Sequence, residues 1–114
     1  MQRGTSKFSS FGLKGGTATA ASGAATLNEF AGVVTSEALT TAAAAEYTLT
    51  LTNAKVEAGS VVLVSLANGT NTQGVLNLIR VTPAAGSVVI VVRNIHGSQA
   101  LNGTIRISFF VVQQ

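Results

Sequence analysis

The 114-residue sequence contains no cysteine, no tryptophan and no aspartate, and it has a single histidine, His96. Without cysteine the fold can use neither disulfides nor thiolate metal sites, so its stability must come from packing, hydrogen bonds or association with other chains. Without aspartate a Ser-His-Asp triad cannot form, and the chain offers four glutamates as replacements for the acid. We therefore expect no enzyme activity.

Sequence patterns for other kinds of chemistry are also missing. The glutamates are spread singly, and no cluster of metal-ligating residues occurs at short spacing. The stretch GLKGG at 12–16 has a lysine but no following serine or threonine and no preceding strand, so it does not match a phosphate-binding loop. We expect neither a metal nor a cofactor, and we interpret His96 as a solvated loop residue.

Membrane and nucleic-acid partners find little support in the sequence. No apolar run reaches the roughly 18 residues that a membrane span needs, and the N-terminus lacks the apolar stretch of a secretory signal. The few cations and the single tyrosine offer few phosphate contacts and no stacking platform for bases. We expect synthesis in a cytoplasm, no membrane partner and no nucleic-acid partner.

Positive charge is concentrated at the N-terminus. Arg3, Lys7 and Lys14 precede the first glutamate, whereas the four cations and four glutamates that follow balance each other (4 − 4 = 0). The leading segment is rich in glycine, serine, threonine and alanine, without a sustained apolar period. We therefore predict a flexible basic arm at 1–28 and a β-sandwich domain at 29–114.

Alternation of apolar and polar residues predicts two of the strands. In AEYTLTLTN (45–53), Tyr47, Leu49 and Leu51 alternate with threonines, which indicates an apolar inner face and a threonine outer face. In TIRISFFVV (104–112), every second residue from Ile105 is apolar, and the other face turns apolar near its end. This last strand is expected to be half buried and then fully buried.

Other strands are predicted from apolar runs. In the runs at 60–68 and 87–94 apolar residues occupy both odd and even positions, so both faces of each strand are apolar. This pattern indicates cover by a second sheet on one side and by another subunit on the other. The stretch 75–81 is expected to place Leu76 and Leu78 on one face, with Val75, Ile79 and Val81 opposite. AATLN and GVVT upstream are two further candidates, whereas the alanine-rich SEALTTAAAAEY is too weakly patterned for a stable helix.

Two short repeats indicate turns. AGSVV occurs at 58–62 and again at 85–89, each time after a strand and a short turn, so both copies are predicted to be the return strand of a hairpin. Asn-Gly-Thr occurs at 68–70 and 102–104, and Asn-Gly favours turns over glycosylation in a chain without a secretory signal. The fold class predicted is all-β, an antiparallel β-sandwich, for which jelly-roll connections are one form.

Several phrases in the body of the chain resemble a known group of proteins. LTLTN, NGTNT, TPAAGSV and ALNGT, within the region from Gly32 to Val112, resemble small β-rich virion proteins of tailed bacteriophages, of the kind that decorate or cement capsids. The resemblance implies a structural protein on the outer surface of the capsid that stabilises the shell by bridging major capsid protein subunits. Such proteins form trimers or other symmetric oligomers at junctions between capsid hexamers and clasp the shell with terminal arms.

The chemistry of the N-terminal arm agrees with a clasping role, and we assign partner contacts to six of its residues. We expect apolar anchoring from Phe8, Phe11 and Leu13, and electrostatic contacts from Arg3, Lys7 and Lys14. Two other classes stay open. A phage tail or fibre domain for host attachment would share the sandwich, and a carbohydrate-binding module would need exposed aromatic rings, of which this chain offers few.

Overall fold

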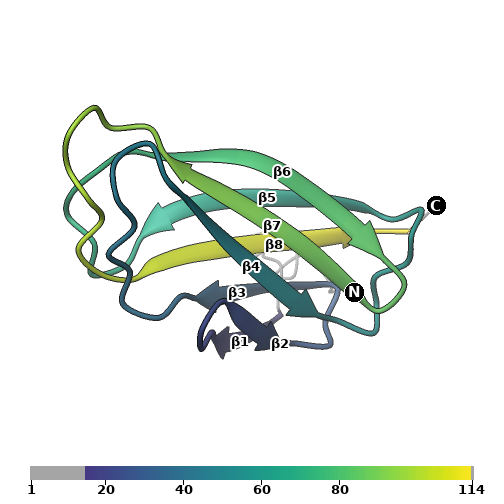
Figure 1. Ribbon diagram of the computed structural model, residues 1–114. Helices are drawn as coiled ribbons and strands as arrows, with labels where there is room; N and C mark the ends of the chain where they lie inside the picture. The colour runs from purple at the N-terminus through teal and green to yellow at the C-terminus, as the bar shows by residue number, and fades with distance from the viewer. Residues whose placement is uncertain (1–14, 114) are drawn as a thin grey trace, which may run out of the picture.

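The computed structural model describes residues 15–113, and within them the chain forms eight strands in two four-stranded sheets, without a helix (Figure 1). Sheet A has the order β1 (Gly16–Thr19), β3 (Ala31–Thr35), β8 (Ile105–Val112) and β5 (Val61–Asn68). Sheet B has the order β2 (Ala24–Thr26), β4 (Glu46–Thr52), β7 (Ser87–Asn94) and β6 (Leu76–Ala84). The prediction of an all-β sandwich is confirmed.

The two sheets pack face to face around one hydrophobic core. In Figure 1, β4, β7 and β6 run diagonally in front of β3, β8 and β5. Leu49 and Ile90 of sheet B, with Val34 and Ile107 of sheet A, are completely buried between them. Burying a side chain of this size contributes about 1.5–3 kcal/mol, so the core is the main source of stability in a chain that has no disulfide.

The strand pairing is mixed rather than purely antiparallel. β3–β8, β5–β8, β4–β7 and β6–β7 are antiparallel, but β1 pairs with β3 and β2 pairs with β4 in parallel. The antiparallel prediction is therefore wrong for these two edge pairs. From β3 onward each connection crosses between the sheets except the β6–β7 hairpin.

Part of the predicted arm belongs to the sandwich. The Ala20 N–H donates to the Thr35 carbonyl at 2.8 Å, and the Thr50 N–H donates to the Gly23 carbonyl at 2.8 Å. These bonds continue the pairing of β1 and β2 with the sheets, so the predicted boundary at residue 28 is too late. The side chains of this stretch are small, so the sequence showed no apolar period there. Its strands are held by backbone hydrogen bonds instead.

The alternating strands face as predicted over most of their length. Tyr47, Leu49 and Leu51 are buried while the threonines between them are exposed, which confirms the interpretation of β4. In β8 every second residue from Ile105 to Val111 is buried. Its outer side does not become fully buried, because Phe110 is half-buried and Val112 is 36% exposed.

A bulge changes the faces of β6. The register shifts between Leu78 and Arg80, which inserts one extra residue opposite β7. Val81 therefore returns to the inner side, where it packs against the core with Leu76 and Leu78. The prediction that Val81 lies opposite those leucines is wrong for this reason.

The two AGSVV copies have different roles. The second copy starts the return strand of the β6–β7 hairpin, whose turn places Gly86 at a φ of 83°. The first copy lies on the connection from β4 in sheet B to β5 in sheet A, so it does not belong to a hairpin. This connection is held against the hairpin tip, since Gly86 donates its N–H to the Val56 carbonyl and accepts from the Asn53 N–H, both at 2.9 Å.

Candidate functional site

The six residues predicted to bind a partner all lie outside the described residues. They are Arg3, Lys7, Phe8, Phe11, Leu13 and Lys14. The site that the structure can describe must therefore be sought on the sandwich, among residues 15–113. Five features of the sandwich are relevant: a histidine loop, a partly buried tyrosine–glutamate pair, the two Asn-Gly-Thr repeats, the buried asparagines and the outer faces of the sheets.

His96 is half-buried and organises the loop that follows β7. Its Nδ1 accepts the backbone N–H groups of Ser98 at 3.0 Å and Gln99 at 2.9 Å. The side chain thus closes a tight turn, which gives it a structural role. Within residues 15–113 there is no group of three or more His, Cys, Asp or Glu residues that could hold a metal ion.

Glu37 and Tyr47 form a partly buried polar pair. The Tyr47 hydroxyl donates to Glu37 Oε1 at 2.8 Å, and the Gly23 N–H donates to Glu37 Oε2 at 2.8 Å. Burial raises the pKa of Tyr47 well above its usual range, and the hydrogen bond to Glu37 and the negative charge of that carboxylate raise it further. The pair fastens the β1–β2 turn to β4.

The two Asn-Gly-Thr repeats form a clasp between the end of β5 and the start of β8. The Thr70 N–H donates to Thr104 Oγ1, and the Thr104 N–H donates to Thr70 Oγ1, both at 2.9 Å. A Cβ on Gly69 would lie 2.3 Å from Thr104 Oγ1, and a Cβ on Gly103 would lie 2.5 Å from Thr70 Oγ1. Neither Asn-Gly closes a hairpin, so each glycine is required for the close approach of the other repeat.

Buried asparagines, which the sequence interpretation did not single out, fix the neighbouring loops. Asn94 is fully buried, donates to the carbonyls of Thr41 and Gln99, and accepts the N–H groups of Val75 and His96. Polar side chains that replace backbone partners in this way stabilise loops that lack regular structure. A strand-end asparagine next to a turn is too common a pattern to have identified it.

The outer side of sheet A carries exposed apolar side chains at one end of the sandwich. Val61 pairs with Val112, and Leu63 pairs with Phe110, so these four side chains point to the same side. Leu63 is 55% exposed and Val61 is 38% exposed. We call this group, Val61, Leu63, Phe110 and Val112, the apolar face.

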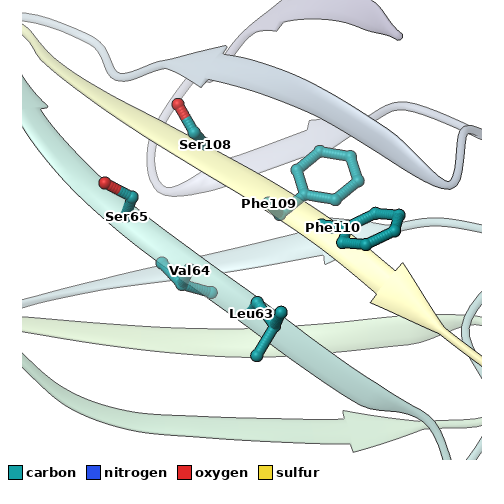
Figure 2. A pocket seen from close by; sticks show the side chains of 6 residues that line it. All are labelled: Leu63, Val64, Ser65, Ser108, Phe109 and Phe110. Carbon is teal, nitrogen blue, oxygen red and sulfur yellow. The ribbon is translucent and has the colours of Figure 1, made fainter. Parts of the chain in front are cut away.

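The apolar face continues into a shallow hollow of about 320 Å³ between β5 and β8. Figure 2 shows Leu63 and Phe110 at one end of the hollow and Ser65 and Ser108 at the other, all on the near side of the two strands. On the strands of sheet A the one charged side chain that points outward is Arg106, three residues or more from the apolar pairs. The hollow therefore favours an uncharged occupant with hydroxyl groups at one end.

The outer side of sheet B is different in character. Thr48, Thr50 and Thr52 of β4 and Thr82 of β6 are all exposed. Val89 and Val91 of β7 lie between them and are half-buried by these neighbours. We call this side the threonine face. We predicted that 60–68 and 87–94 are covered on both sides. Within the molecule the other sheet covers their inner sides, whereas the outer side of β5 is exposed.

No helix in residues 15–113 is long and apolar enough to cross a membrane. Comparisons with protein-family models, with curated proteins and with solved structures find no match for this chain.

Proposed function

We propose that this protein is a structural virion protein that binds the outside of a bacteriophage capsid and stabilises the shell by bridging major capsid protein subunits. In this proposal the N-terminal segment clasps the shell, and the sandwich supplies a rigid body that associates into a symmetric oligomer, a homotrimer. Its location is the capsid surface of the virion, after synthesis in the host cytoplasm.

The observation that carries the proposal is the apolar face on sheet A. Leu63 is more than half exposed, and its neighbours Val61, Phe110 and Val112 extend the patch across two strands without an intervening charge. Contiguous apolar patches on a protein surface mark contacts with other macromolecules. The described residues meanwhile use their histidine and their tyrosine–glutamate pair to hold loops, which favours a binding role over a chemical one.

The leading segment adds a second contact of suitable chemistry. Phe8, Phe11 and Leu13 can each contribute about 1.5–3 kcal/mol when buried against a partner. Arg3, Lys7 and Lys14 carry the excess positive charge of the chain, since the remaining residues are balanced. A segment with apolar anchors between cations suits an acidic, grooved surface such as a capsid lattice.

The test is sedimentation of the purified protein with empty capsids assembled from the major capsid protein encoded in the same genome. The full chain is expected to sediment with the capsids, and deletion of residues 1–14 is expected to weaken binding by about a hundredfold or more. Thr50→Ser on the threonine face is the matched control and should bind as the full chain does. Mass measurement of the free protein should give three copies.

A fibre or tail function predicts a different result. A body that attaches to a host through its tip would not sediment with capsids, and the deletion would leave host attachment unchanged. Either that result, or equal capsid binding with and without residues 1–14, would overturn the proposal.

A further inference from the structure

The apolar face lies within reach of the chain that precedes the described residues. Gly16 pairs with Gly32 in parallel register, so Gly15 lies beside Ala31, and a Cβ on Gly15 would be 1.8 Å from the Ala31 carbonyl oxygen. Ala31 pairs with Phe110, and Phe110 pairs with Leu63. Gly15, the first described residue, therefore lies in line with the paired residues Ala31, Phe110 and Leu63 of neighbouring strands. This line crosses β3 and leads to the hollow.

The distances along this row fit the spacing of the N-terminal apolar residues. Strands lie about 4.8 Å apart, so β8 is about 10 Å and β5 about 14 Å from β1. An extended chain covers about 3.3 Å per residue, which gives Phe11 a reach of about 13 Å and Phe8 about 23 Å from Gly15. Leu13 reaches about 7 Å, which ends above β3. Phe11 is thus the first large apolar residue that can enter the hollow between Leu63 and Phe110.

The area of the face also favours a chain segment over a second folded copy. β5 and β8 have eight residues each and β3 has five, so at about 3.3 Å per residue and 4.8 Å per strand this side of the three strands measures about 330 Å². A standard interface buries about 800 Å² on each partner, roughly twice that area. An extended run of six residues is about 20 Å long, which is enough to cross the width of about 14 Å of these three strands.

Charge and polarity agree with this occupant. The outward side chains of β3, β5 and β8 include no glutamate, so the cations of the segment gain nothing there and its apolar side chains provide the attraction. Ser9 and Ser10 follow Phe8 in the sequence, and Ser65 and Ser108 line the polar end of the hollow. Hydroxyl groups on both sides can pair when the rings dock.

We propose that residues 8–13 of the same chain dock on the apolar face, with Phe11 in the hollow between Leu63 and Phe110. In the free protein this segment covers the patch that would otherwise associate with other molecules. A short tether keeps the segment at millimolar effective concentration over the face, so docking needs no high intrinsic affinity. The inference does not depend on the identity of the partner, and it is tested on the isolated protein.

The absence of natural cysteines allows a direct test by disulfide formation. One variant of the full chain carries Ser9→Cys and Ser65→Cys, which leaves every apolar residue of the proposed contact in place. The matched control carries Ser9→Cys and Thr19→Cys, with the second cysteine on β1, exposed and nearer to Gly15 than Ser65 is. Disulfides require Cα atoms within about 7 Å, so the rate of oxidation in dilute protein reports how often each pair meets.

Docking predicts that the Ser9–Ser65 pair oxidises about tenfold or more faster than the nearer control pair, and that the product has the mass of one chain. Adding Phe11→Ser should lower that rate to the control value, because it removes the side chain that enters the hollow. Equal rates for the two pairs, or a rate insensitive to Phe11→Ser, would overturn the proposal. Products with the mass of two chains would also overturn it and would assign the face to a second copy. Loss of capsid binding with docking intact, or the reverse, separates this inference from the proposed function.

Discussion

The outer faces of sheets A and B carry different side chains. β4 of sheet B and β5 of sheet A follow each other in the chain, and in both strands inner and outer residues alternate. β4 presents Thr48, Thr50 and Thr52, whereas β5 presents Val61 and Leu63. Threonine gives a strand its β-branched side chain together with a hydroxyl that water can bind, so the threonine face is stable when exposed. The apolar face has no such hydroxyl at Val61 and Leu63. Sheet B therefore exposes mainly hydroxyl groups, with Ile79 at the β6 bulge as an exposed apolar side chain, whereas β5 and β8 expose Val61, Leu63 and Val112 together.

The largest expected effect separates the inner and outer sides of the strands. Leu49→Ala, in a fully buried position, should lower the free energy of unfolding by about 2–5 kcal/mol, because it removes core contacts and leaves a cavity. Leu63→Ala on the apolar face should cost less than about 1 kcal/mol in a chain lacking residues 1–14, where nothing from that segment can cover it. Urea unfolding of both variants measures the contrast. Equal losses would contradict the assignment of inner and outer sides.

The clasp joins the end of β5 to the start of β8, at the other end of these strands from the apolar face, and it can be tested with two glycines. Gly103→Ala should destabilise the protein by about 1–3 kcal/mol, since the new methyl group would collide with Thr70 and the backbone beside it. Gly97→Ala is the control, because a Cβ there meets nothing within 4 Å, and it should leave the thermal midpoint almost unchanged. Similar midpoints for both variants would show that the clasp is looser than the hydrogen bonds indicate.

Alkaline pH tests the inner side of the strand that carries the threonine face. The pKa of Tyr47 is raised by burial, by its hydrogen bond to Glu37 and by the charge of that group, so above about pH 10 the folded state keeps a proton that the unfolded state loses. Stability from this group is therefore full below pH 10 and decreases as pH rises, by up to about 1.4 kcal/mol per pH unit.

Because Tyr47 is the single tyrosine, ultraviolet absorbance can follow its ionisation directly. Unfolding free energies measured from pH 9 to 11.5 should show the slope, and Tyr47→Phe should remove the part that this residue contributes. A slope that is unchanged by Tyr47→Phe would assign the alkaline loss to other groups.

The smallest effect on stability is expected from exchanging the character of the two faces. Leu63→Thr with Phe110→Thr should change the free energy of unfolding by about 1 kcal/mol or less in the chain without residues 1–14, yet it should reduce the binding of a fluorescent hydrophobic dye to that chain severalfold. Thr50→Leu with Thr82→Leu, the reverse exchange, should create dye binding on sheet B. Undiminished dye binding after the first exchange would show that the apolar face is not the exposed patch.

The sequence predicted the inner and outer faces of a strand correctly where the outward residues are polar. It failed where the outward residues are apolar. In β4 the threonines made the inner side unambiguous. In β5 and β7 both sides are apolar, and local sequence does not tell that β7 lies in the middle of its sheet while β5 lies at an edge. The difference depends on which strands pair, which is a property of the whole chain.

Other failures have equally local causes. The two identical AGSVV copies adopt different roles because Gly86 forms hydrogen bonds with residues 53 and 56. These bonds hold the β4–β5 connection, which contains the first copy, against the β6–β7 hairpin. Val81 was assigned to the wrong face because one extra residue at the bulge reverses the alternation. The hollow was not predicted, since it is formed by residues of β5 and β8 that are more than forty positions apart. The signal that could have indicated the hollow was the presence of apolar residues on both faces of 60–68.

The reciprocal bonding of Thr70 and Thr104 makes the two positions dependent on each other over evolutionary time. Each hydroxyl accepts the N–H of the other residue, so losing one hydroxyl leaves the partner's backbone donor unsatisfied. A single replacement is harmful while a double one can restore balance, and residues in such contact tend to co-vary. Natural variants of this chain should therefore keep hydroxyl side chains at both positions or change both together, and the two glycines before them should follow the same rule.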